Sequence, residues 1–207
     1  MPTYQALLIG NGEKLPARML QHWAHQADYV LAVDGGADKA LACGVVPDGV
    51  IGDLDSVSAA AQKKLAGKIW HVPTQNNTDL EKALLWCKQH HKTSVLLVGF
   101  VGDRWDFSFG NMLTIGAYAL QLTLTLAGDG WQLVPVVCRA SFACTPGKRV
   151  SIIPLSDCRG VTLRGLVYPL VGAALKRGTT RSLSNQTAGK QFSVSVERGT
   201  LLVYQEL

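Results

Sequence analysis

Two carboxylates in one short segment are the first candidates for chemistry. Asp53 and Asp55 stand two positions apart in PDGVIGDLDS, which spans residues 47–56. The apolar pair Val50 and Ile51 predicts a short buried strand that runs directly into them. Asp, Gly, Pro and Ser also form ordinary turns, but two anions at the end of a buried strand repel each other. The segment therefore predicts a bound cation.

Three further acidic loops follow predicted strands in the same half of the chain. They are residues 34–38, 75–79 and 99–106. Taken singly, each has an ordinary explanation: a tight turn at Asp34, complementation of a helix dipole by Asp79, or a surface ion pair between Arg104 and Asp106. Ligands of an open α/β sheet bind outside the carboxyl ends of its strands. We therefore expect all four acidic loops to line one edge of a sheet.

The donor atoms of these loops indicate magnesium and phosphate. Oxygen ligands without paired His or Cys suit Mg²⁺ rather than zinc, and Mg²⁺ commonly accompanies phosphate groups. Arg104 offers a fork for phosphate oxygens, and Lys82 lies one turn into a predicted helix whose N-terminus favours anions. Glycines that would let the backbone approach a bulky anion stand at positions 10, 12, 35, 36 and 52. The chain has neither a GxxxxGK[ST] loop nor a GxGxxG motif.

Alternating strands and helices must position these loops. Strands are predicted at 4–9, 29–33, 49–51, 69–72, 94–98 and 122–126, and helices at 15–27, 37–43, 59–66, 79–91 and 109–121. Thr78 and Glu81 form a capping-box pattern at the start of the fourth helix. This order predicts a doubly wound, mostly parallel sheet.

The pattern changes after the turn at residues 128–130. Short β runs are predicted at 132–138, 149–154, 161–163, 192–196 and 201–204, and the last two form a hairpin. We therefore expect an α/β domain at 1–127 followed by an antiparallel β-sandwich at 128–207.

Composition limits the class of protein. The 207 residues are 47% hydrophobic and 17% charged, which is typical of a globular chain, and no apolar run reaches the length of a membrane span. The N-terminus lacks the pattern of a secretory signal, so we expect a soluble, cytoplasmic protein. Five cysteines without a CxxC pair argue against a disulfide framework or a structural zinc.

The net charge of +5 is unevenly distributed. Residues 126–207 hold 10 Lys and Arg against 4 Asp and Glu. A basic half can indicate nucleic acid, but these residues are scattered singly and few aromatic residues lie among them. We therefore expect neither a nucleic-acid partner nor a membrane partner.

The ordered motifs resemble those of the thiamine pyrophosphokinase family. They cover nearly the whole chain: VDGGAD at 33–38, PDGVIGDLDS at 47–56, TDLEKAL at 78–84, GDRWD at 102–106, GLVYPL at 165–170, SLSN at 182–185 and GTLLV at 199–203. The run PDxxIGDxDS is specific. The resemblance implies Mg²⁺-dependent transfer of a diphosphoryl group from ATP to the hydroxyl of thiamine, with release of AMP. It also implies a catalytic nucleotide-binding domain and a β-sandwich that binds thiamine, paired as a homodimer with active sites between subunits.

The resemblance also assigns roles to individual residues. The Mg²⁺–phosphate residues carry over to Asp34, Asp53, Asp55 and Asp79, of which the last three are expected to ligate the metal. Nucleotide and phosphate contacts carry over to Gly35, Gly36, Thr78, Lys82, Arg104, Asp106 and Asn111. The thiamine side carries over to Tyr168, Ser184 and Asn185. Asp53, Asp55, Asp79, Arg104 and Asp106 form the expected catalytic group, in which Asp79 or Asp106 could serve as a base.

Three departures from the family pattern concern the acceptor more than the nucleotide. Phe107 stands where relatives often have His, Asp103 adds a charge, and residues 176–181 contain three basic side chains. A diphosphokinase of another alcohol, such as a hydroxymethylpterin, is therefore an alternative. So is a non-catalytic regulator that binds nucleotide or thiamine, and a nucleic-acid-binding module comes last.

Overall fold

The computed structural model describes residues 3–102 and 104–207, in two compact units. The first unit holds the chain as far as Thr114 together with Gln121–Asp129. The second unit holds Ile115–Leu120 and Gly130–Leu207. Among the described residues, no helix has the length and apolar character that a membrane crossing requires.

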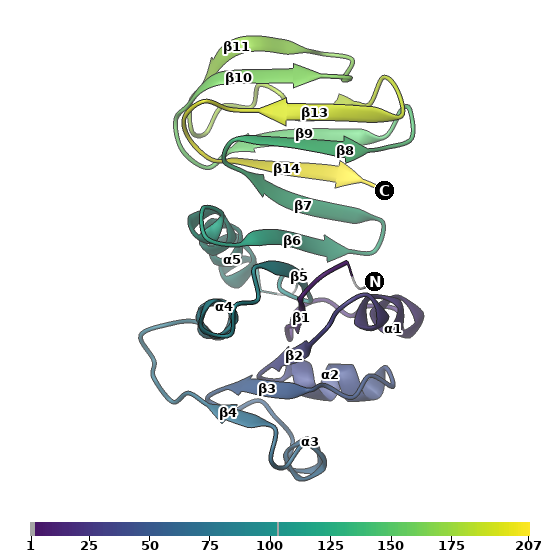
Figure 1. Cartoon of the computed structure of the whole chain (residues 1–207), viewed down its shortest axis with the longest axis vertical. Helices are drawn as coiled ribbons and strands as arrows, with labels where there is room; N and C mark the ends of the chain where they lie inside the picture. Colours follow the sequence, from purple (N-terminus) through teal and green to yellow (C-terminus); the bar gives the residue numbers. More distant parts are fainter. Residues whose placement is uncertain (1–2, 103) are drawn as a thin grey trace. The chain divides into compact units, whose positions relative to one another are not determined.

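Among residues 3–102 and 104–207, six parallel strands form the sheet of the first unit (Figure 1). They are β1 (Ala6–Ile9), β2 (Val30–Val33), β3 (Gly49–Gly52), β4 (Ile69–His71), β5 (Ser94–Val98) and β6 (Thr123–Gly128). Their order is β6-β5-β1-β2-β3-β4, and every neighbouring pair is parallel. Every residue of β1, β2 and β3 is buried, as expected for strands covered on both faces.

In the described part of the chain, five helices connect these strands. They are α1 (Ala17–His25), α2 (Gly36–Ala42), α3 (Ala59–Lys64), α4 (Asp79–Gln89) and α5 (Trp105–Tyr118). Leu20 of α1 and Ala40 of α2 pack with Leu7 and Ile9 of β1, whereas α4 contacts β2 and β3 from the opposite side (Figure 1). The predicted doubly wound parallel sheet is confirmed.

The strand order places a switch point between β1 and β5. The chain runs outward from β1 to β4 on one side and from β5 to β6 on the other. The loops that leave β1 and β5 therefore turn in opposite directions and leave a crevice between them, where ligands of such sheets bind.

The second unit is a β-sandwich. One group of strands has the order β12-β9-β14-β7 and the other has β11-β10-β13-β8. The strands are β7 (Trp131–Val136), β8 (Arg139–Ala143), β9 (Arg149–Pro154), β10 (Cys158–Arg164), β11 (Leu170–Leu175), β12 (Asn185–Gln186), β13 (Gln191–Ser195) and β14 (Leu201–Glu206). Side chains from both groups, such as Ile152 and Phe192, share one apolar core. The predicted antiparallel sandwich is confirmed.

Some elements differ from the sequence prediction. Helix α5 begins at Trp105 rather than at residue 109, so part of the predicted acidic loop is helical. Strands β8, β11 and β12 were missed. Only Phe142 of β8 is buried, and β11 pairs irregularly around Gly172, whose φ is +58°, so neither strand has a clear alternating pattern.

Candidate active site

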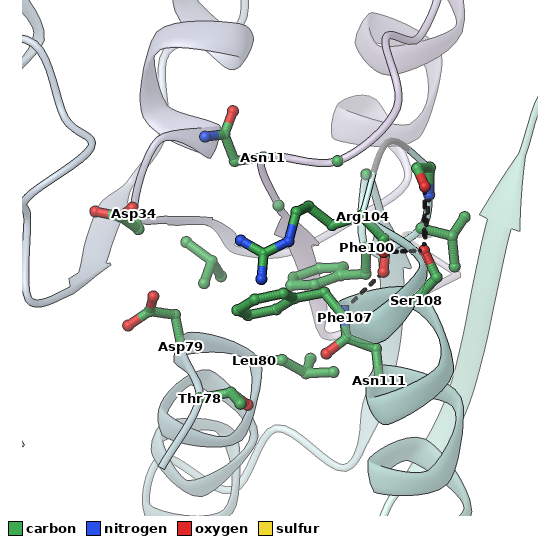
Figure 2. A pocket seen from close by; sticks show the side chains of 16 residues that line it. Asn11, Asp34, Thr78, Asp79, Leu80, Phe100, Arg104, Phe107, Ser108 and Asn111 are labelled. Carbon is green, nitrogen blue, oxygen red and sulfur yellow. Dashed lines mark hydrogen bonds between the residues drawn. The ribbon is translucent and has the colours of Figure 1, made fainter. Parts of the chain in front are cut away.

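A pocket of about 290 Å³ opens at the switch point of the first unit. Its lining residues come from the end of β2, from the loops after β1, β2 and β5, and from the first turn of α4 and the first two turns of α5: Gly10, Asn11, Gly12, Val33, Asp34, Thr78, Asp79, Leu80, Gly99, Phe100, Val101, Gly102, Arg104, Phe107, Ser108 and Asn111. Figure 2 shows Asp34 and Asp79 at one end, and the rings of Phe100 and Phe107 with Leu80 towards the other. The pocket therefore has an acidic end and an apolar end.

Glycines allow the loop after β1 to touch the loop after β5. A Cβ on Gly10 would lie 2.6 Å from the Gly99 carbonyl oxygen, and one on Gly12 would lie 2.4 Å from that of Val101. Lys39 fastens the first loop, because its Nζ donates to the carbonyl oxygens of Asn11, at 2.7 Å, and of Gly12. The glycines noted in the sequence at 10 and 12 thus serve loop–loop packing.

The structure brings together three carboxylates beside this pocket. Asp34, Asp53 and Asp55 each offer an oxygen within 4.8 Å of the others. Asp34 is 7% exposed, and its Oδ1 is buried with no hydrogen-bond partner among the described residues. Its φ of +47° lies in the left-handed region, a strain that proteins retain at functional sites. A buried, unpartnered carboxylate oxygen next to two other carboxylates fits a cation.

A buried lysine neutralises part of this acidic end. Lys82 is 5% exposed; its Nζ donates to Asp79 Oδ1 at 2.8 Å and lies 4.0 Å from Asp53 Oδ2. Gln75 donates to Asp53 Oδ2 at 3.0 Å and is the main reason that the pKa of Asp53 is lowered. Burial raises the pKa of Asp79, while the hydrogen bond from Lys82 opposes this rise. Asp53 and Asp79 thus differ in how readily each gains a proton.

The three carboxylates that lie together are not the same three that the sequence analysis expected as metal ligands. We expected Asp53, Asp55 and Asp79 as metal ligands and Asp34 as a further residue of the same Mg²⁺–phosphate site. The described residues instead group Asp34 with Asp53 and Asp55, and Asp79 is bound to Lys82. Lys82, predicted as a nucleotide or phosphate contact, contacts Asp79 and Asp53 and does not line the pocket.

Arg104 and Asp106 form an exposed ion pair at the pocket. The Arg104 Nη2–Asp106 Oδ2 distance is 2.5 Å, and Arg104 Nε also donates to Asp106 Oδ1 at 3.0 Å. The hydrogen bonds from Arg104 lower the pKa of Asp106 to about 2. The guanidinium lies 4.5 Å from the centre of the Phe107 ring and extends into the pocket (Figure 2). Asp103, the other departure in this loop, lies outside the described residues.

Two polar side chains of α5 shape the pocket wall. Asn111 is 6% exposed, and its Nδ2 donates to the Phe100 carbonyl oxygen at 2.7 Å (Figure 2). The Ser108 hydroxyl accepts from the Gly102 backbone N–H at 3.0 Å. The predicted nucleotide contact Asn111 therefore lines the pocket, where its amide supports the loop after β5.

Gly35 and Gly36 lie at the start of α2 and pack against protein atoms, whereas the sequence predicted that they contact nucleotide or phosphate. A Cβ on Gly36 would lie 1.9 Å from the Ile9 carbonyl oxygen, and one on Gly35 would lie 2.4 Å from Asn11 Nδ2. Both glycines therefore face neighbouring protein atoms, and neither lines the pocket. Thr78 caps α4 as predicted, since its Oγ1 accepts from the Glu81 backbone N–H at 3.3 Å.

A second hollow, of about 460 Å³, lies in the β-sandwich. Its lining residues come from the turn before β11 and the segment before β12: Val167, Tyr168, Pro169, Leu170, Arg181, Ser182, Leu183 and Asn185. Tyr168 lines this hollow and is 67% exposed. The expected thiamine-side residues Tyr168 and Asn185 thus meet here, while Ser184 is exposed and does not line the hollow.

Asn185 acts on the backbone of Tyr168. It is 1% exposed; its Oδ1 accepts from the Tyr168 N–H at 3.0 Å, and its Nδ2 donates to the Tyr168 carbonyl oxygen at 2.8 Å. The Gln186 N–H also donates to this Oδ1, at 2.9 Å. With its amide engaged in this way, Asn185 is a positioning residue for Tyr168.

Asn185→Ala should therefore make the backbone of Tyr168 less well ordered and leave the acidic pocket unchanged. Three hydrogen bonds are lost, and we expect the free energy of unfolding to fall by about 2–3 kcal/mol. For the thiamine acceptor that the resemblance implies, the KM should rise severalfold, while the KM for the nucleotide should change little. Urea unfolding and steady-state kinetics measure both effects, and an equal rise in the two KM values would contradict the positioning role.

Sequence reasoning missed several residues of the site. Asn11 lines the pocket, and Phe100 and Leu80 supply its apolar end. The sequence carried one usable signal for Asn11, its place in the loop that directly follows the first strand. Phe100 and Leu80 carried none, since apolar residues of this kind belong to any core.

Comparison with known proteins places the chain in a family. The family model "Thiamin pyrophosphokinase, catalytic domain" matches residues 20–126, and "Thiamin pyrophosphokinase, vitamin B1 binding domain" matches residues 140–201. Thiamine pyrophosphokinase of Bacillus subtilis is 28% identical over 205 residues, which cover 95% of each chain. Thiamin pyrophosphokinase 1 of Caenorhabditis elegans is 26% identical over 182 residues, which cover 81% of this chain and 74% of the relative.

A solved structure agrees with these matches. The crystal structure of thiamin pyrophosphokinase from Geobacillus thermodenitrificans superposes with a TM-score of 0.83 at 25% identity, covering 98% of this chain and 97% of that one. The catalytic-domain match alone spans more than half of the chain, and it contains the carboxylate group and all the pocket-lining residues except Gly10, Asn11 and Gly12. The chain belongs to the thiamin pyrophosphokinase family of enzymes.

Proposed function

We propose that this protein transfers the diphosphoryl group of ATP to the hydroxyl of thiamine, giving thiamine diphosphate and AMP. The observation that carries the proposal is the convergence of Asp34, Asp53 and Asp55 beside a pocket at the switch point. An acidic end next to an apolar end suits a nucleotide whose base enters the apolar part and whose phosphates meet a cation at the acidic part.

Mg²⁺ fits the acidic end. Its donors are all carboxylate oxygens, and the buried Asp34 Oδ1 lacks a partner among the described residues. We propose that Asp34, Asp53 and Asp55 hold the ion, with Asp79 close to its phosphate side. When bound, Mg²⁺ neutralises the charge on the phosphates of ATP.

The residues of the chain then position and activate the reactants. Lys82 keeps Asp79 and Asp53 fixed, and Arg104 offers guanidinium N–H groups to the phosphate oxygens on which charge develops. We propose Asp79 as the base that accepts the thiamine hydroxyl proton. Its pKa is raised, whereas Asp106, with a pKa of about 2, is a poor proton acceptor.

We propose the β-sandwich, residues 128–207, as the thiamine-binding and dimerisation domain, and residues 1–127 as the nucleotide-binding domain. The Tyr168 ring can lie against a cationic thiazolium. Helix α5 carries three large apolar side chains on one face, Trp105, Phe109 and Leu113, which are 83%, 63% and 44% exposed. A second copy could cover them; light scattering would then give twice the chain mass of 22.2 kDa.

We also propose a cytoplasmic location. All five cysteines are unpaired. Burial raises the pKa of the Cys87 thiol to about 12, so it stays protonated and inert. Thiols of this kind are typical of a reducing compartment.

An acceptor panel tests the proposal. The protein is incubated with ATP and Mg²⁺ plus thiamine, a hydroxymethylpterin or no acceptor, and AMP is measured. We expect AMP release with thiamine alone and its loss when EDTA removes the metal. Release with the pterin would favour a different diphosphokinase, and no release with any acceptor would favour a binding protein.

A further inference from the structure

The hollow of the β-sandwich has an electrostatic property that its proposed ligand does not explain. Arg181 lines it, and none of the other lining residues is acidic or basic. Thiamine carries a permanent positive charge on its thiazolium ring. A guanidinium in the same hollow repels that charge, so Arg181 is unfavourable for thiamine alone.

Arg181 is also available to a ligand. Within residues 3–102 and 104–207, no acidic side chain forms an ion pair with it, and its own backbone N–H donates to Thr179 Oγ1 at 3.3 Å. The backbone that follows Arg181 is fixed, since the Ser182 carbonyl accepts from Ile152 N at 2.9 Å and Asn185 is hydrogen-bonded to Tyr168. Arg181 therefore stands beside an ordered segment that lines the hollow.

A phosphate group on the ligand would offset the repulsion between Arg181 and the thiazolium ring. The fork of an arginine matches phosphate oxygens and binds them through charge-assisted hydrogen bonds. A ligand with an aromatic cation at Tyr168 and phosphate oxygens at Arg181 would place each charge next to a favourable partner. We propose that Arg181 binds a phosphate group of the ligand in this hollow, so that the hollow favours the diphosphorylated product over thiamine; this rests on the proposed function.

Arg177 provides a matched control. It is an exposed arginine four residues before Arg181, and its backbone N–H donates to Asp157 Oδ1 at 2.9 Å, but it does not line the hollow. Arg181→Leu and Arg177→Leu remove the same charge from the same basic segment. A difference between the two variants therefore reports the hollow rather than the general charge of the unit.

Calorimetric titration without metal is the test, on wild type and both variants. Arg181→Leu should weaken thiamine diphosphate by about 10- to 100-fold, the range for a lost charge-assisted hydrogen bond. It should leave thiamine affinity unchanged or slightly improved, and Arg177→Leu should change neither.

Two outcomes would overturn it. One is an Arg181→Leu variant that binds thiamine and thiamine diphosphate with the affinities of the wild type. The other is an equal loss of affinity for thiamine and for thiamine diphosphate. If the wild type releases AMP with thiamine but either of these results appears, the inference about Arg181 fails and the proposed function stands. If the wild type neither binds thiamine nor releases AMP, the proposed function itself fails.

Discussion

Asp53→Asn should lower turnover by about 100- to 1,000-fold while leaving the fold intact, the scale seen when a charged or polar group that stabilises a transition state is removed. Asp53 lies in the three-carboxylate group and is 4.0 Å from Lys82 Nζ. Asn keeps the size of the side chain but removes its negative charge, so the site loses affinity for a divalent cation. Steady-state AMP release across a range of Mg²⁺ concentrations measures the loss, and high Mg²⁺ should restore part of it.

Asp48 provides the control in the same segment. Its Oδ2 accepts from the Val30 N–H at 2.8 Å, and it lies outside both the carboxylate group and the pocket lining. Asn at this position keeps a side-chain acceptor, so Asp48→Asn should retain near-normal turnover. Equal losses in Asp48→Asn and Asp53→Asn would indicate damage to the segment rather than to a metal site, and near-normal turnover in Asp53→Asn would remove Asp53 from the chemistry.

Gly36→Ala should lower the free energy of unfolding by about 3 kcal/mol or more, because the added methyl group has no space. Its Cβ would lie 1.9 Å from the Ile9 carbonyl oxygen and 2.8 Å from the carbonyl carbon, both rigid backbone atoms of β1. To relieve this clash, α2 must move away from β1, which also displaces the adjacent Asp34. Urea denaturation gives the free energy, and an unchanged m-value would show that two-state unfolding persists.

Gly110→Ala is the matched helical control. Gly110 lies within α5, and nothing stands within 4 Å of the position that its Cβ would occupy. Alanine has the higher helix propensity, so this change should be neutral or stabilising by up to about 1 kcal/mol. If Gly36→Ala were as stable as Gly110→Ala, the close packing of α2 on β1 would be wrong.

Most of the fold could be predicted because its sequence patterns are local. The buried runs of β1, β2 and β5 are apolar on both faces, and Thr78 marks the start of α4. Helix α5 was placed too late because its first turn was interpreted as an acidic loop motif. In the sandwich, β11 escaped detection because a positive φ at Gly172 and shifted pairing interrupt its alternation.

The candidate site was predictable at the level of loops but not of contacts. The acidic residues follow strands, so their meeting at one edge could be expected, and Asp34, Asp53 and Asp55 do lie together. The sequence could not show that Lys82 contacts the acidic residues or that Asn185 holds the backbone of Tyr168. Both facts depend on side-chain directions set by tertiary packing, which residue types and spacing do not determine.

Transfer of the diphosphoryl group in one step is the central claim. The most direct measurement follows ATP labelled at the β-phosphorus, incubated with the protein, Mg²⁺ and thiamine, with all products separated. The account predicts that the label leaves the nucleotide and enters thiamine diphosphate, with one AMP released for each product molecule and both forming about 100- to 1,000-fold more slowly in Asp53→Asn. Label recovered in ADP, together with thiamine monophosphate, would contradict it.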